Sequence, residues 1–143
     1  MLRWYLDTSV LLRVIVEQSP SARLWYLAAR GRGDQFISSR LLELEAKRNA
    51  GRAGVDPQIV DAYLSDIAFV PLSDAILDDA LKIAGHLRSA DALHLASAQR
   101  VGADLLTVVT HDRQMAAAAV ALGFDVLDPV VDDPGHAAVT VDL

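Results

Sequence analysis

Short apolar runs alternate with helix-starting signals along most of this chain, and this alternation constrains the fold more than any other feature. Most candidate strands are followed within a few residues by a serine, threonine or aspartate that can cap the next helix. Strands separated by helices pair in parallel through helical crossovers rather than as hairpins. The sequence therefore predicts an α/β fold, with a central, mostly parallel sheet of four to five strands and helices on both faces.

The expected element ranges follow from apolar periodicity and capping residues. Strands are expected at 3–6, 35–38, 69–72, 105–110 and 124–127. Helices are expected at 8–18, 20–31, 39–50, 73–85, 89–101 and 112–123, with a further helix starting at Pro57. Residues 1–128 are predicted to form one domain. The tail at 129–143 has three acids and no lysine or arginine, so it is predicted to be a loose acidic extension.

Composition indicates the cellular setting that we expect. The chain has 143 residues, of which 52% are hydrophobic, so its core needs neither disulfides nor a stapling metal. It has no cysteine, and its start lacks a basic segment followed by a long apolar run. We therefore expect a cytoplasmic protein without a signal peptide or membrane anchor.

Charge is unevenly distributed along the sequence. Nineteen acids against thirteen lysines and arginines leave a net charge of −6, which argues against nucleic acid wrapping around the whole surface. Residues 23–52 nevertheless contain seven basic and three acidic residues, a local excess of +4. This segment is a candidate for holding phosphates, and the alternative is a pair of ordinary solvated helix faces.

Two aspartates follow predicted strands closely. Asp7 comes after the run at 3–6, and Asp112 comes after the run at 105–110. Ligands of parallel sheets bind at the carboxyl ends of the strands, where both side chains are expected. Either aspartate alone could instead be a helix N-cap. Two acids at equivalent places on two strands favour a shared site.

A third acid lies on the helix expected at 39–50. Glu45 lies beside the apolar stripe that should face the sheet, whereas Glu43 is expected to pair with Lys47 in solvent. Carboxylates near apolar surface are rarely buried unless they are paired or bound to metal. Glu45 is therefore a site candidate, with a salt bridge to Arg48 as the alternative.

The fourth acid begins a strongly apolar helix. Asp91 lies in the first turn of the helix at 89–101, where the helix dipole favours an acid in any case. His94 lies one turn further along the same face. It is a candidate for the rim of a site, and the alternative is a histidine satisfied inside the core.

Four carboxylates at one sheet edge would repel each other strongly unless a cation neutralised them. Oxygen ligands without cysteine suit Mg²⁺ or Mn²⁺ rather than zinc. Carboxylate clusters that hold such ions activate water and stabilise both oxygens in phosphodiester cleavage. The residues therefore predict metal-dependent phosphodiester cleavage, with Asp7, Glu45, Asp91 and Asp112 as metal ligands and catalytic residues.

Four stretches also carry a resemblance to a known family. YLDTSVLL, SSRLLELEAKR, RSADALHLASA and VVTHDRQMAAAAVALGF, in this order and spacing, resemble a PIN-domain ribonuclease, and more narrowly the VapC toxins of type II toxin–antitoxin modules. The similarity covers about residues 2–128. It implies the PIN-like three-layer fold and the same four acids, with Thr8 and Thr110 as hydroxyl residues at the rim. Relatives place either an acid or a histidine at His94, so one and two metal ions stay open.

The resemblance implies a Mg²⁺- or Mn²⁺-dependent endoribonuclease that inhibits translation, a homodimer, and a cognate antitoxin that covers the site. Trp4, Trp25 and Tyr26 exceed what a small core obviously needs, and aromatic residues are enriched at interfaces. These residues support the expected homodimer.

The predicted RNA-binding surface is basic, because an acidic centre cannot itself attract RNA. Arg30, Arg32, Arg40 and Arg52 are predicted to flank the site and bind phosphates. The expected substrate is a structured RNA cut at a single-stranded loop, where unstacked bases can be read.

Other classes of protein fit less well. A response-regulator receiver needs a lysine after a late strand, but Lys47 and Lys82 both fall in predicted helices. No G-x-x-x-x-G-K-[ST] sequence is present for nucleotide binding. The remaining alternatives are a PIN nuclease of RNA processing without a toxin role and a PIN-like binding module without catalysis.

Overall fold

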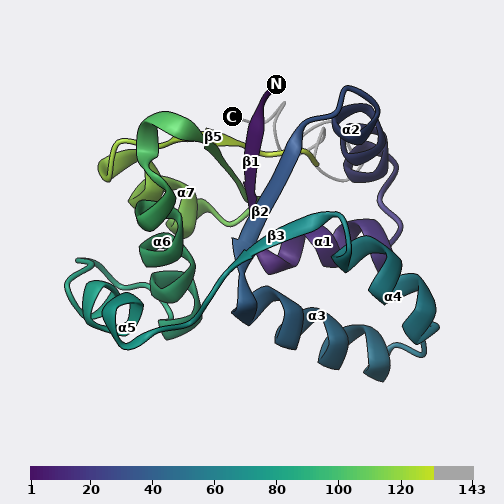
Figure 1. Cartoon of the computed structure of the whole chain (residues 1–143), viewed down its shortest axis with the longest axis horizontal. Helices are drawn as coiled ribbons and strands as arrows, with labels where there is room; N and C mark the ends of the chain where they lie inside the picture. The colour runs from purple at the N-terminus through teal and green to yellow at the C-terminus, as the bar shows by residue number, and fades with distance from the viewer. Residues whose placement is uncertain (131–143) are drawn as a thin grey trace.

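The computed structural model describes residues 1–130 and contains one five-stranded sheet (Figure 1). All five strands run parallel, in the spatial order β3-β2-β1-β4-β5. The strands are β1 (Arg3–Leu6), β2 (Gln35–Ser39), β3 (Ile67–Val70), β4 (Thr107–Val109) and β5 (Asp125–Leu127). The predicted parallel sheet is confirmed. Its carboxyl edge, where the strands end, is shared by the segments that follow β1 and β4.

Two strands differ from their predicted ranges. β3 begins two residues earlier than expected, because Ile67 pairs with Phe36 and the strand ends before Pro71, which has no backbone N–H to donate. β4 is shorter than expected, because a 3₁₀ turn, η1 (Ala103–Leu105), takes up the start of the apolar run.

Seven α-helices connect and follow the strands within the described part of the chain. They are α1 (Thr8–Ile15), α2 (Pro20–Gly31), α3 (Arg40–Arg52), α4 (Pro57–Leu64), α5 (Asp74–Leu81), α6 (Ser89–Val101) and α7 (Arg113–Ala121). Capping side chains accept backbone N–H bonds at the starts of α2, α3, α4 and α5, from Ser19, Ser39, Asp56 and Ser73. The helices expected to reach Gln18 and Gly85 end earlier, at Ile15 and Leu81.

The helices form two layers, with α1 to α4 on one face of the sheet and α5 to α7 on the other (Figure 1). Neighbouring strand residues point to opposite layers, as the pleat requires. On β1, Leu6 packs into the cluster under α1 to α4, and Tyr5 packs into the cluster under α6 and α7. On β2, Phe36 packs into the same cluster as Leu6, and Ile37 packs into the same cluster as Tyr5.

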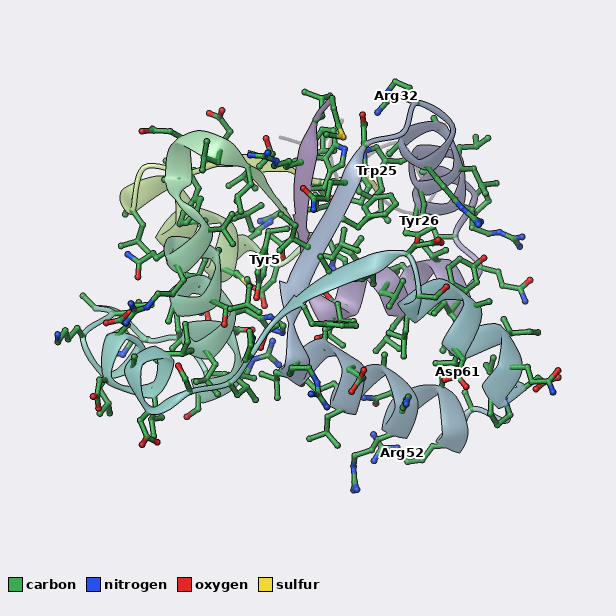
Figure 2. All side chains as sticks on the ribbon, viewed as in Figure 1. Tyr5, Trp25, Tyr26, Arg32, Arg52 and Asp61 are labelled. Atoms are coloured by element: carbon green, nitrogen blue, oxygen red, sulfur yellow. The ribbon has the colours of Figure 1, made fainter. Side chains whose placement is uncertain are left out.

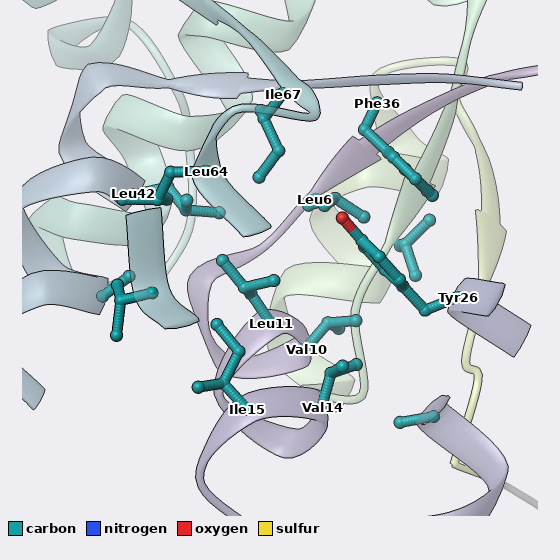
Figure 3. Close-up of a cluster of buried hydrophobic side chains, with 14 of the residues drawn as sticks. Leu6, Val10, Leu11, Val14, Ile15, Tyr26, Phe36, Leu42, Leu64 and Ile67 are labelled. Carbon is teal, nitrogen blue, oxygen red and sulfur yellow. The ribbon is translucent and has the colours of Figure 1, made fainter. Parts of the chain in front are cut away.

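The aromatic residues expected at a dimer interface pack against one another and against the core cluster under α2. Tyr26 is buried and stacks on Phe36 with ring centroids 4.5 Å apart (Figure 3). Trp4 and Trp25 meet edge to face at 5.4 Å and pack against the same core cluster. The expectation that these residues exceed the needs of the core is wrong for Tyr26, which is buried, whereas Trp4 and Trp25 are partly buried and keep some exposed surface.

The core continues slightly beyond the predicted domain end. Val130 is fully buried in the cluster with Leu6 and Tyr26, two residues after the expected boundary at 128. The rest of the expected acidic extension, 131–143, lies outside the described residues. Within residues 1–130, no helix is both long enough and apolar enough to cross a membrane.

Candidate active site

Asp7 faces a cavity rather than capping a helix. It occupies the N-cap position of α1, but its side chain makes no capping bond. Its Oδ2 instead accepts from Ser9 Oγ and from Thr110 Oγ1, both at 2.9 Å. The side chain is buried, with 6% of its surface exposed. The helix-cap alternative therefore fails for Asp7, because two hydroxyls hold this carboxylate at the carboxyl edge.

Asp112 both caps a helix and faces the same edge. Its Oδ1 accepts from the backbone N–H groups of Gln114 and Met115, which begins α7. Its Oδ2 accepts from Arg88 Nη2 at 3.3 Å. Asp112 can therefore be both a helix N-cap and a residue of the candidate site, since Oδ1 caps α7 and Oδ2 contacts Arg88.

Arg88 connects two of the acids, and sequence reasoning missed it. It stands at the N-cap of α6 and donates from Nε to Asp91 Oδ2 at 3.2 Å, as well as to Asp112. A cation at a helix N-terminus opposes the helix dipole, so its position was an available signal. Arg88 is the counter-ion of this acidic group.

Asp91 is buried at the start of α6, with 5% of its residue surface exposed. Burial raises the pKa of its carboxyl, and the charges of Asp7 and Asp112 raise it further. The hydrogen bond and charge of Arg88 oppose this shift but do not cancel it. The raised pKa of Asp91 is therefore caused first by burial, and the neighbouring carboxylates add to it.

Glu45 reaches the same place from α3. Its Oε1 accepts from Thr8 Oγ1 at 2.8 Å and lies 3.4 Å from His94 Nε2. Burial raises the pKa of Glu45, but the hydrogen bonds from His94 and Thr8 outweigh burial, so the net shift is downward. Within residues 1–130, no ion pair joins Glu45 to Arg48, so that alternative is wrong.

Glu43 lies outside this group, as expected, but its predicted partner is wrong. It pairs with Arg40 at 2.9 Å, whereas Lys47 lies 3.9 Å from Asp61 on α4. Arg40 and Glu43 lie three residues apart on α3, and such residues are neighbours on a helix surface, whereas the neighbouring helix α4 supplies the acid for Lys47.

A cavity of about 210 Å³ gathers most of the predicted site residues. Its lining residues are Asp7, Thr8, Ser9, Leu12, Glu45, Asn49, Arg88, Ala90, Asp91 and His94. Asp112 adjoins this cavity through Arg88, and Thr110 adjoins it through Asp7. His94 lines the cavity and is also buried, with 1% of its surface exposed. A position beside the predicted site and a hydrogen-bonded position in the core are therefore compatible for this histidine.

The donor set fits a divalent metal ion in its chemistry. Within residues 1–130, no hydrogen bond reaches Asp7 Oδ1, Glu45 Oε2 or Asp91 Oδ1. Carboxylate oxygens are the ligands that Mg²⁺ and Mn²⁺ prefer. As the side chains stand, no three acids or histidines among the described residues are arranged to enclose an ion. Arg88 bridges Asp91 and Asp112 in this arrangement.

Two of the four predicted RNA-binding arginines lie at the wrong edge of the sheet. Arg30 pairs with Asp66, directly before β3, and Arg32 pairs with Asp34, directly before β2. Both are therefore at the amino edge, and the prediction that they flank the acids is wrong. Figure 2 places Arg32 and Arg52 at opposite ends of the molecule.

The other two arginines lie on α3. Arg52 donates to Asn49 Oδ1 at 2.6 Å, and Asn49 lines the cavity with the acids. Arg40 begins α3 and lines a separate cavity with Leu72. The structure thus leaves Arg40 and Arg52 on the helix that carries Glu45.

A family model and named relatives match most of this chain. The family model of the PIN domain matches residues 4–121, so the chain belongs to the PIN-domain family. Ribonuclease VapC47 of Mycobacterium tuberculosis (strain CDC 1551 / Oshkosh) is 32% identical over 130 residues, covering 87% of this chain and 96% of the relative. Ribonuclease VapC46 (strain ATCC 25618 / H37Rv) is 33% identical over 141 residues, with the same coverage. Within the family, the chain is of the VapC type.

Solved structures share the fold. A toxin–antitoxin complex from Klebsiella pneumoniae matches with a TM-score of 0.65 and 19% identity, covering 87% of this chain and 96% of the other. VapBC2 from Rickettsia felis, bound to a DNA fragment from its promoter, matches with a TM-score of 0.66 and 12% identity, covering 88% and 98%. The predicted PIN-like architecture is confirmed.

Proposed function

We propose that this chain is a Mg²⁺- or Mn²⁺-dependent endoribonuclease in which Asp7, Glu45, Asp91 and Asp112 hold the metal. One observation carries the proposal: four carboxylates from four separate segments lie at the carboxyl edge of the sheet, where the guanidinium of Arg88 pairs with two of them. That arrangement leaves more negative charge than Arg88 can neutralise. A fold gains nothing from such an excess unless a cation joins it.

Each acid has a defined part in this proposal. Ser9 and Thr110 hold Oδ2 of Asp7, which leaves its other oxygen for the metal. Thr8 and His94 do the same for Glu45. A divalent ion held there supplies charge stabilisation at the phosphate and acidifies water for the attack.

The RNA is proposed to approach along α3 and the start of α6. Arg88 lines the cavity and is 75% exposed, so it can turn from the carboxylates to a phosphate. Arg52 and Arg40 extend the basic surface along α3. We propose a folded RNA cut in a single-stranded loop, because a duplex holds its phosphodiesters in a stacked, regular geometry.

A toxin role in a toxin–antitoxin pair follows from the relatives. The VapC name of the sequence relatives and the toxin–antitoxin complexes among the solved structures support a cognate antitoxin that covers the acidic cavity. We propose that the free toxin inhibits translation by RNA cleavage in the cytoplasm. The homodimer remains a proposal based on the resemblance, because Tyr26 lies in the core and Trp4 and Trp25 pack against it.

The test is cleavage of a labelled structured RNA with Mn²⁺, with EDTA, and after substitution of one acid. Glu45→Gln is expected to abolish cleavage. Glu43→Gln is the matched control, because it lies two residues away on α3 and pairs outside the cavity. Undiminished wild-type cleavage in EDTA would contradict the metal mechanism.

The substrate and the toxin role have their own readouts. A loop sequence in a hairpin should be cut much faster than the same sequence locked in a duplex. Induced expression in a bacterium should stop growth for the wild type but not for Asp7→Asn. Growth arrest by both would indicate a binding module rather than a nuclease.

A further inference from the structure

A buried hydrogen-bond chain links the core to Glu45. Tyr5 on β1 is fully buried, and its Oη lies 2.9 Å from His94 Nδ1. His94 Nε2 lies 3.0 Å from Thr8 Oγ1, which lies 2.8 Å from Glu45 Oε1. Figure 2 shows Tyr5 deep inside the molecule, between the two helical layers. A residue without exposed surface is thus connected to a carboxylate that lines the cavity.

The number of protons that these groups carry decides which group is the donor at each contact of this hydrogen-bond chain. A glutamate carboxyl is ionised at neutral pH, and an ionised Glu45 can only accept hydrogen bonds. Thr8 therefore gives its one hydroxyl proton to Glu45. The contact between Thr8 and His94 then requires Nε2 to be the donor. A neutral imidazole carries one proton, so Nδ1 is bare and accepts from Tyr5.

We propose that Tyr5 is a positioning residue for Glu45, because its hydroxyl fixes His94 as the Nε2–H tautomer and so directs the Thr8 proton to Glu45 Oε1. The inference rests on the proposed function, in which Glu45 binds the metal through its other oxygen. In the opposite tautomer, Nε2 would accept the Thr8 proton. Glu45 would then lose its shortest hydrogen bond and its fixed orientation.

A purely structural role for Tyr5 makes a different prediction. All buried side-chain polar atoms within residues 1–130 have a hydrogen-bond partner, so the Tyr5 hydroxyl could serve only to satisfy His94. Its removal would then lower stability and leave the metal site unchanged. Metal affinity and the tautomer of His94 separate the two roles.

¹⁵N NMR of the metal-free wild-type protein at pH 8 measures the tautomer directly. We expect a protonated Nε2 and a bare, hydrogen-bonded Nδ1 on His94. A protonated Nδ1 would overturn the proposal, and this spectrum decides even where a variant does not fold.

Tyr5→Phe removes the hydroxyl and leaves the ring. We expect its Mn²⁺ affinity, measured by titration calorimetry, to fall about threefold to tenfold, at or below the roughly 10- to 100-fold typical of groups bonded directly to a metal ligand. The His94 spectrum should gain the second tautomer. Tyr26→Phe is the matched control: Tyr26 is also buried, but its hydroxyl faces Asp66 at the amino edge. It should keep the wild-type affinity and tautomer.

Glu45→Gln separates this inference from the proposed function. If Glu45→Gln binds Mn²⁺ as tightly as the wild type, Glu45 is not a ligand, and both claims about it are wrong. If Glu45→Gln weakens binding but Tyr5→Phe does not, only the positioning role of Tyr5 is wrong.

Discussion

At the amino edge of the sheet, two aspartates each meet a complete set of partners. Asp34 accepts from Trp4 Nε1 at 3.0 Å and from Arg32 at 2.8 Å. Asp66 pairs with Arg30 and accepts from the Tyr26 hydroxyl. Each acid has its own arginine and an aromatic donor, so the protein's own residues neutralise its charge.

At the carboxyl edge, the guanidinium of Arg88 pairs with only two of the four carboxylates. Hydroxyl and imidazole groups hold one oxygen of Asp7 and of Glu45, and Arg88 reaches only Asp91 and Asp112. The same residue types therefore have opposite consequences at the two edges. Acids matched by arginines stabilise the fold, whereas unmatched acids mark the place where a cation and substrate are expected.

Asp7→Asn gives the largest expected effect. The change keeps the side-chain size but removes a charged ligand, so RNA cleavage should fall on the order of 10³-fold or more. Asp34→Asn makes the same chemical change at the amino edge and should lower the melting temperature while cleavage is retained. Both rates are measured on a labelled RNA at a temperature where both variants are folded. Equal losses of cleavage would remove the distinction between the edges.

Mn²⁺ should stabilise the protein through the carboxyl edge alone. At a free concentration one hundred times its Kd, it should add about 2.7 kcal/mol to the free energy of unfolding, because it binds the folded state. Urea unfolding with and without Mn²⁺ measures the gain, and EDTA should reverse it. Asp34→Asn should keep the full gain and Glu45→Gln should lose most of it. An unaltered unfolding curve for the wild type would contradict a metal site.

Arg88→Gln should strengthen Mn²⁺ binding, because it removes the cation that competes for Asp91 and Asp112. The side chain is 75% exposed, so solvent screens the interaction and the gain should be at most about fivefold. Calorimetry measures it, with Arg30→Gln at the amino edge as the control. Weaker Mn²⁺ binding in Arg88→Gln would instead indicate that the guanidinium orders the carboxylates.

The smallest effect concerns the pH dependence of stability. Burial, aided by Asp7 and Asp112, raises the pKa of Asp91 in the folded state. Its stabilising contribution is therefore complete below the unfolded pKa and is lost as pH rises through the folded value. Asp91→Asn should stabilise the metal-free protein more at pH 7 than near pH 4. Urea unfolding at the two pH values tests this, and an equal effect at both would contradict it.

Local chemistry was enough to predict the parallel sheet and the position of the acids at its carboxyl edge. A strand that ends shortly before Asp7 or Asp112 places that residue at the carboxyl edge of the sheet, whatever the rest of the chain does. Glu45 could be separated from Glu43 by helical periodicity, since residues two apart lie on different sides of a helix. These inferences depend on neighbours within one element.

Partners distant in sequence could not be predicted in the same way. Arg88 contacts Asp112 across 24 positions, and Tyr5 contacts His94 across 89. The error at Arg30 and Arg32 was avoidable. A helix that connects two parallel strands returns to the amino edge, and both arginines lie just before β2.

The central position of β1 has a consequence during synthesis. β1 pairs with β2 and with β4, whose residues are made about a hundred positions later in the chain. Thr110 donates a hydrogen bond to Asp7, and Asp112 is the fourth carboxylate of the proposed site. This site is therefore incomplete until the ribosome has added both residues. At about 5–20 residues per second, that takes roughly 6 to 22 s. If Asp112 is a metal ligand as proposed, RNA cleavage can begin only after this residue has been made.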